Sequence, residues 1–124
     1  MKYFKFYLLA GILTNSMGCI PGNELHTSVC FTTQHHEKVI PDITIWVKYN
    51  SETFPGFDPP NNFDTSIESD ASGRVCMRDF PLGHHWFVGF GYDPEIGQQV
   101  IGSWDYEFNL RNLSVDTILY VGEE

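Results

Sequence analysis

Apolar and polar residues alternate in short runs along this chain, and glycine or proline separates most of the runs. Alternation with a period of two places successive side chains on opposite faces of a β-strand. In residues 43–48, for example, Ile43, Ile45 and Val47 alternate with polar or aromatic neighbours. No long segment shows the period of three to four residues that is typical of a helix. The pattern therefore predicts an all-β protein.

About seven strands can be placed in this pattern, which is the number found in a small antiparallel β-sandwich. They are expected at residues 26–33, 43–47, 63–69, 74–80, 84–92, 100–102 and 113–122, while residues 103–112 are ambiguous. The segment between the first two strands, residues 34–38, is expected to be a polar loop. Residues 51–62 contain three prolines, which lack the backbone donor that a central strand needs, so they are also expected to form a loop.

The phase of the alternation predicts which side chains fill the core. The inward positions are Val29, Phe31, Val75, Met77, His85, Phe87 and Gly89. Asp70 can accept hydrogen bonds from its own turn, and Gly73 can take the positive φ that such a turn requires. Gly83 is expected at a second corner.

The N-terminal residues have a different pattern. Two lysines precede an apolar run at residues 6–13, and small residues then lead to Cys19. This is the order of a secretory signal, and the run is shorter than the roughly 20 residues of a membrane-spanning helix. Ser16 and Gly18 fit an ordinary cleavage site, whereas the cysteine after them fits a bacterial lipoprotein signal. The lipoprotein pattern usually has leucine at the position that Ser16 occupies.

Both interpretations remove residues 1–18, but only the second attaches lipid. We expect acylation of Cys19, because an unpaired cysteine at this place otherwise has little reason to exist. The predicted organisation is a lipoprotein signal peptide at residues 1–18, a tether at 19–25 and a β-sandwich domain at 26–124. The expected location is the cell envelope, anchored to the outer membrane.

The charge balance narrows the choice of partners. The chain has 7 basic and 16 acidic residues, a net charge of −9. Nucleic acid is excluded, because phosphate binding needs clustered lysine and arginine. Electrostatic docking onto an anionic membrane is excluded for the same reason, so only the acyl chains at Cys19 would hold the protein to the lipid bilayer.

Two further cysteines, Cys30 and Cys76, lie on different expected strands in what would be an oxidising compartment. They could form a disulfide that contributes roughly 3–4 kcal/mol. They could equally be two separate, half-buried thiols, because the geometry of a disulfide cannot be read from a sequence.

Three motifs occur in a consistent order. They are "VIPDITIWV", "SDASGRV" and "FPLGHHWFVGFGYD", and together they cover residues 39–93. They resemble the corresponding elements of transthyretin-like (prealbumin-like) and carboxypeptidase-regulatory-like β-sandwich domains. With the signal in front, the whole chain is similar to small exported lipoproteins of Bacteroides-type bacteria. One departure is that His85 stands where these domains usually have tyrosine.

The transthyretin-like family includes a hydrolase that acts on a urate derivative. Its catalytic histidines, arginine and terminal "YRGS" have no counterpart in "LYVGEE", so the resemblance does not imply that activity. Neither a G-x-S-x-G nucleophile motif nor an EF-hand loop is present. Cys76 is better explained as a strand residue than as a nucleophile. No catalytic residue and no cofactor are predicted.

A metal site would need three or four converging ligands. The five histidines are His26, His35, His36, His84 and His85. Adjacent residues on a strand point to opposite faces, so His84 and His85 cannot easily share an ion, although the loop pair could join one of them. Solvated loop histidines and one core histidine are the simpler interpretation, and no metal is predicted.

The remaining candidates are aromatic. Possible binding residues are Trp46, Phe54, Phe57, Trp86, Trp104 and Tyr106. Such side chains stack on sugars and anchor protein interfaces, or they cover the edges of a core. We therefore expect a membrane-anchored, non-catalytic binding or accessory module for an unknown protein or glycan. The alternatives are a small hydrolase or metal-dependent enzyme that uses the histidines, and a structural subunit that pairs through an edge strand.

Overall fold

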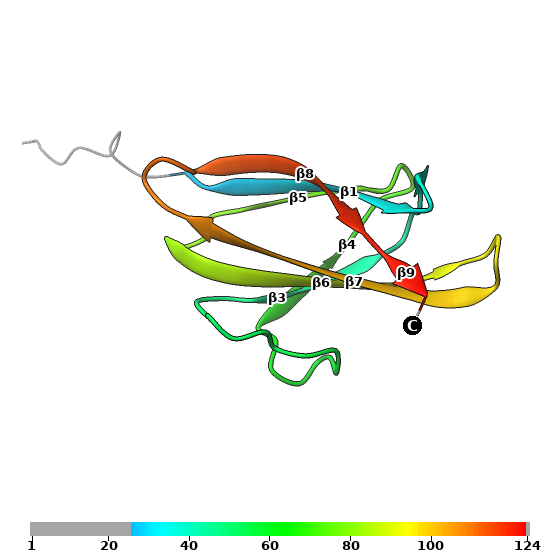
Figure 1. Ribbon diagram of the computed structural model, residues 1–124. Helices are drawn as coiled ribbons and strands as arrows, with labels where there is room; N and C mark the ends of the chain where they lie inside the picture. The colour runs from blue at the N-terminus through cyan, green and yellow to red at the C-terminus, as the bar shows by residue number, and fades with distance from the viewer. Residues whose placement is uncertain (1–25, 124) are drawn as a thin grey trace, which may run out of the picture.

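The computed structural model describes residues 26–123, which form a sandwich of two packed sheets (Figure 1). The fold is all-β, as the alternation predicts, and the described residues contain no helix. Residues 26–123 contain nine strands rather than about seven. They are β1 (Ser28–His35), β2 (Lys38–Val39), β3 (Thr44–Lys48), β4 (Thr65–Glu68), β5 (Arg74–Arg78), β6 (Gly83–Asp93), β7 (Gln98–Phe108), β8 (Ser114–Tyr120) and β9 (Gly122–Glu123).

The larger sheet has five strands in the order β4-β3-β6-β7-β9, and every pair in it is antiparallel. In the smaller sheet, β1 is the centre. β5 and β2 pair with successive parts of one edge of β1, and β8 pairs with the other edge. The β1–β8 pair is parallel, which differs from the wholly antiparallel sandwich expected from the sequence.

The core lies between the sheets and consists of the inward positions of both. Ile43, Ile45 and Val47 of the larger sheet are fully buried, and so are Val29 and Phe31 of the smaller one. The period-two pattern predicted all five correctly. Burial of each such side chain contributes roughly 1.5–3 kcal/mol to the free energy of unfolding.

β7 is much longer than the short strand expected at residues 100–102. β7 pairs with β6 along its whole length, from Phe108 opposite Gly83 to Gln98 opposite Asp93. Residues 103–108 of the segment that was ambiguous in the sequence therefore belong to a regular strand. Gly102, inside the expected strand, must be glycine, since a Cβ there would overlap the backbone carbonyl of Tyr120, just before β9 pairs with β7.

The predicted polar loop at residues 34–38 is a tight hairpin instead. β1 continues to His35, and His36 and Glu37 form a two-residue turn with φ of 51° and 67° before β2 begins. Asn and Gly are the usual residues of such a turn, and neither is present here. The sequence therefore gave no turn signal at this hairpin.

The turn before β5 matches its prediction. Asp70 Oδ1 accepts hydrogen bonds from the backbone N–H groups of Ser72 and Arg74, at 2.9 and 3.0 Å, and Gly73 has a φ of 75°. The Ser72 hydroxyl also donates to Oδ1, at 2.6 Å, and this bond, followed by the backbone bonds, holds the pKa of Asp70 below its usual value. The second corner, Gly83, also has a positive φ.

Candidate functional site: an aromatic face and two histidine clusters

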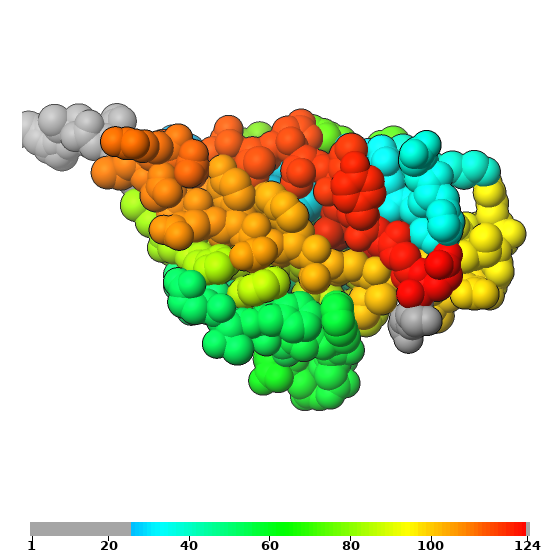
Figure 2. All heavy atoms as spheres, viewed as in Figure 1, coloured from blue at the N-terminus to red at the C-terminus, as the bar shows by residue number. Residues whose placement is uncertain are grey.

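The outer face of the five-stranded sheet carries a cluster of aromatic side chains. Trp46 of β3 and Trp86 of β6 fall on the outward phase of their strands, and a loop at residues 49–64 lies over them. In Figures 1 and 2 this green loop projects from the sheet on the side away from the smaller sheet. We call Trp46, Phe54, Phe57, Phe63, Trp86 and Phe90 the aromatic face.

Edge-to-face contacts link most of these rings. The ring centre of Phe54 lies 5.1 Å from that of Trp86 and 4.8 Å from that of Phe57. Phe57 also approaches Phe90 at 6.4 Å. Phe54 and Phe57 remain 37% and 50% exposed, so the face presents two phenyl rings to solvent over the half-buried indole of Trp86.

Both ends of the loop are fixed to the sheet by backbone hydrogen bonds. At its start, the Ser51 N–H donates to the His84 carbonyl at 2.8 Å. At its end, the Asp64 N–H donates to the Val47 carbonyl at 2.8 Å, and Asp64 Oδ2 accepts from the Tyr49 N–H. The exposed phenyl rings therefore belong to an anchored segment.

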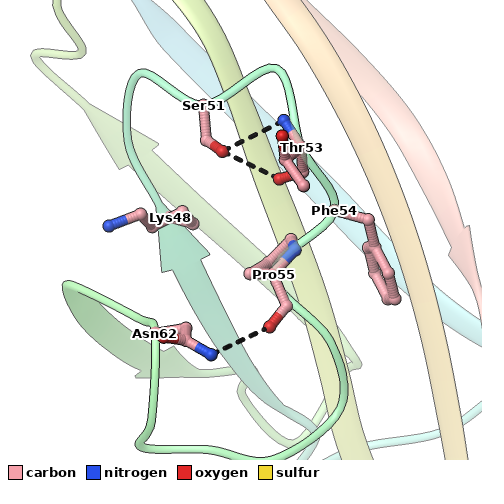
Figure 3. A pocket seen from close by; sticks show the side chains of 6 residues that line it. All are labelled: Lys48, Ser51, Thr53, Phe54, Pro55 and Asn62. Atoms are coloured by element: carbon pink, nitrogen blue, oxygen red, sulfur yellow. Dashed lines mark hydrogen bonds between the residues drawn. The ribbon is translucent and has the colours of Figure 1, made fainter.

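A pocket of about 250 Å³ lies within this loop, beside the aromatic face (Figure 3). It is lined by Lys48, Ser51, Thr53, Phe54, Pro55 and Asn62. Figure 3 shows Phe54 pointing across the sheet and away from Lys48. The lining combines hydroxyl and amide groups with a phenyl wall and one amine, which suits a side chain with an apolar stem and a polar end.

His84 borders the aromatic face and is held between two carboxylates. Its Nδ1 lies 2.8 Å from Glu52 Oε1, and its Nε2 lies 2.6 Å from Asp105 Oδ2. The hydrogen bond to Glu52, followed by the bond to Asp105, raises the pKa of His84. The ring also stacks on Trp86 at 5.8 Å. With both nitrogens engaged, His84 has no free nitrogen to act as a general base.

His85, on the opposite side of β6, is fully buried in the core. Its Nδ1 accepts a hydrogen bond from the Asn50 N–H at 2.9 Å, and its Nε2–H donates to the Pro81 carbonyl at 2.7 Å. Burial lowers the pKa of His85, which keeps the ring neutral. A neutral imidazole can both accept and donate, which a tyrosine cannot do at two separate atoms. His85 therefore joins the Asn50 and Pro81 backbone groups inside the core.

Cys30 and Cys76 form a disulfide between β1 and β5, where the two residues are directly paired and their Cα atoms are 4.1 Å apart. The bond lies on the outer side of the smaller sheet. In this form neither sulfur is a thiolate, so neither can act as a nucleophile.

Trp104 and Tyr106 are not part of the aromatic face. They lie on the core side of β7, where Trp104 packs against Phe31 at 5.4 Å and stacks on Tyr106 at 5.2 Å. Their partners across the strands, Phe87 and His85, are both buried. The sequence grouped all six aromatic candidates together because the ambiguous segment had no assigned phase. Trp46, Phe54, Phe57 and Trp86 share the outer face.

A second histidine cluster lies at the far end of β6. His35, predicted as a loop residue, is a strand residue with only 3% exposure. Its Nδ1 lies 2.7 Å from Asp93 Oδ2, and its Nε2 lies 2.5 Å from Glu123 Oε2. His36 Nε2 reaches the same Glu123 oxygen at 3.1 Å. We call His35, His36, Asp93 and Glu123 the histidine–carboxylate cluster.

Sequence reasoning missed this cluster because its members are far apart in the chain and meet only through the topology. In Figure 2, the red β9 lies between the cyan turn after β1 and the yellow turn after β6. Asp93 is fixed there, since its Oδ1 accepts the Glu95 N–H at 2.9 Å. Its partner His35 has a raised pKa, mainly because of the Asp93 hydrogen bond.

The predicted signal peptide, the tether and the acylated Cys19 lie outside the described residues. Within residues 26–123, no helix is long and apolar enough to cross a membrane. No family model matches the chain, and no curated protein matches it.

Proposed function

We propose that this chain is a non-catalytic binding module whose aromatic face captures a segment of a partner protein. The observation that carries the proposal is the pair of exposed phenyl rings, Phe54 and Phe57, on a loop anchored at both ends. Exposed aromatic anchors beside a pocket are the residues that dominate protein interfaces.

The type of exposed ring favours a protein over a glycan. Sugars stack on open indole or phenol rings, but Trp86 is packed by Phe54 and by His84. The exposed rings are phenyl groups without a polar atom, which suit apolar side chains.

The charge around the face indicates a basic partner. Glu52, Asp58 and Asp64 belong to the loop, and Asp105 and Glu107 lie on neighbouring β7. Glu52 and Asp105 already contact His84, and Asp64 contacts Lys48, but the five carboxylates outnumber these two basic groups. Lysine or arginine in the bound segment would complement the remaining negative charge and could stack on the phenyl rings. The expected ligand is therefore an apolar segment flanked by basic residues.

Selection from a displayed peptide library tests this function. The wild-type chain should enrich apolar, basic peptides, and the double variant Phe54→Ala/Phe57→Ala should lose them by at least tenfold in affinity. Leu110→Ala is the matched control, because Leu110 is an apolar side chain with 70% exposure in the β7–β8 turn, away from this face. Equal binding by the double variant, or selective binding to a glycan array instead of peptides, would contradict the proposal.

We also propose that Cys19 carries an acyl anchor that holds the module at the outer membrane, and that the domain is a transthyretin-like sandwich. The first rests on the signal pattern, and the second on the three motifs, which fall on β3, the Asp70 turn and β6. Cys19→Ala should move the protein from the membrane fraction to the soluble fraction. An unchanged distribution would disprove lipid anchoring.

A further inference from the structure

The histidine–carboxylate cluster has the arrangement of a metal-binding site. One ring nitrogen of His35, one ring nitrogen of His36 and a carboxylate oxygen of Glu123 all lie within 4.8 Å of one another. Two imidazoles and one carboxylate are ligands that Zn²⁺ prefers, and three protein ligands leave one position of a tetrahedral site for water. In such a site, neighbouring ligand atoms are about 3.3 Å apart, so the atoms here need to move by less than about 1 Å.

The second observation is the state of His35 itself. Its Nε2 is buried and has no hydrogen bond among the described residues. Glu123 Oε2 is 2.5 Å away, in an ion-pair contact. The Nδ1 atom is already occupied by Asp93. Nε2 is therefore the ring atom of His35 that adjoins the Glu123 carboxylate.

The Asp93 carboxylate orients the imidazole ring of His35. Histidines that bind metals usually donate their other ring N–H to a carboxylate, which fixes the tautomer and strengthens the ligand. The Nδ1–H of His35 donates to Asp93 at 2.7 Å, so Nε2 is left as the ligand atom. Asp93 is buried and held by the turn after β6, which makes this orientation rigid.

Both histidine rings of the cluster converge on one carboxylate oxygen. The ring centres of His35 and His36 are 4.0 Å apart, and both Nε2 atoms approach the same Glu123 oxygen. One divalent cation shared by two neutral rings and the carboxylate satisfies all three groups.

We propose that His35, His36 and Glu123 bind one Zn²⁺ ion, with Asp93 positioning His35. Glu123 belongs to β9, and His35 and His36 belong to the hairpin between β1 and β2. The ion would therefore connect the last described strand to the smaller sheet. His36 and Glu123 are accessible, which gives the ion a path into the site. On β6, the aromatic face uses Trp86 and Phe90 on the outer side of the sheet, whereas Asp93 has the opposite phase, so the two sites can be tested separately.

Calorimetric titration of the purified full-length chain with Zn²⁺ at pH 7 tests the proposal. One ion should bind per chain, and the melting temperature should rise with Zn²⁺ concentration. His36→Asn and Glu123→Gln should each weaken binding at least tenfold and abolish the thermal shift. Asp93→Asn should weaken binding by about 10- to 100-fold, because the orienting carboxylate is lost.

The turn supplies a matched control. His36 and Glu37 both have positive φ, and asparagine accepts that conformation better than either of them. Both His36→Asn and Glu37→Asn should therefore fold, but only the first removes a ligand. His84→Gln controls for binding to another surface histidine. The proposal is wrong if the wild type binds no Zn²⁺, or if His36→Asn binds it as tightly as Glu37→Asn does.

Discussion

His84 and His85 are neighbours on β6, yet their rings occupy opposite environments. His84 lies on the outer face between two exposed carboxylates, which raise its pKa. His85 lies in the core between two backbone groups, and burial lowers its pKa. The same side chain is favoured as a cation on one face and as a neutral ring on the other. Strand alternation alone produces this difference.

The same comparison applies to the whole sheet, whose inner face determines stability and whose outer face carries the proposed binding surface. Phe87→Ala should show the largest difference between the faces. Phe87 is fully buried and packs against Phe31 at 5.1 Å and Phe80 at 5.6 Å, so its loss should reduce the free energy of unfolding by about 3–5 kcal/mol. Phe54→Ala, on the outer face, should cost less than about 1 kcal/mol in the same denaturant titration. Similar losses for both variants would refute the division between the faces.

The disulfide lies on the outer side of the smaller sheet, yet we expect it to contribute to stability, because it links two strands covalently. The double variant Cys30→Ser/Cys76→Ser should lose roughly 3–4 kcal/mol, since the bond closes a loop with a sequence separation of 46 residues. Denaturant titration under oxidising conditions measures the loss. Under reducing conditions the wild type and the double variant should have the same stability, and a persistent difference would assign the effect to packing instead.

His85→Phe should cost about 2–3 kcal/mol, because the Asn50 N–H and the Pro81 carbonyl lose their partner. The folded pKa of His85 is below its ordinary value of 6.5, so protonation favours the unfolded chain. The contribution of His85 is complete above pH 6.5 and falls as the pH decreases below it. The measured cost of the substitution should therefore shrink between pH 7 and pH 5, and a cost that grows over this range would be inconsistent with a buried neutral ring.

His84→Gln should have the smallest effect, less than about 1 kcal/mol, because its carboxylate partners are exposed to solvent and salt. Its pH dependence should have the opposite sign. The folded pKa of His84 is above 6.5, so its contribution is complete below pH 6.5 and is lost as the pH rises through the folded pKa. Parallel pH profiles for the two variants would remove the contrast between these neighbours.

The sequence predicted the fold class and much of the core because both depend on local alternation. Ile43, Ile45 and Val47 could be assigned from their own neighbours. The pairing of β8 with β1 could not, since a pattern within one strand does not specify which distant strand it meets or in which direction.

The histidine–carboxylate cluster was missed for two physical reasons. Its hairpin turn uses His36 and Glu37 where asparagine and glycine are the usual signal, so β1 was expected to end too early. Its carboxylates come from the ends of β6 and β9, which meet His35 only after both sheets have packed. The aromatic face was found in part, because Trp46 and Trp86 lie on strands whose phase was clear.

The parallel pairing of β1 with β8 also determines the order in which the chain can fold. β1 is central to its sheet, but the edge of β1 that pairs with β8 stays unpaired until residues 114–120 are available. β5 comes earlier in the chain than β8, so β1 can pair with β5 while its other edge is still empty. In the interval the other edge of β1 is an unpaired strand, which can pair with other chains. The newly made protein is therefore most prone to aggregation until residues 114–120 have been added.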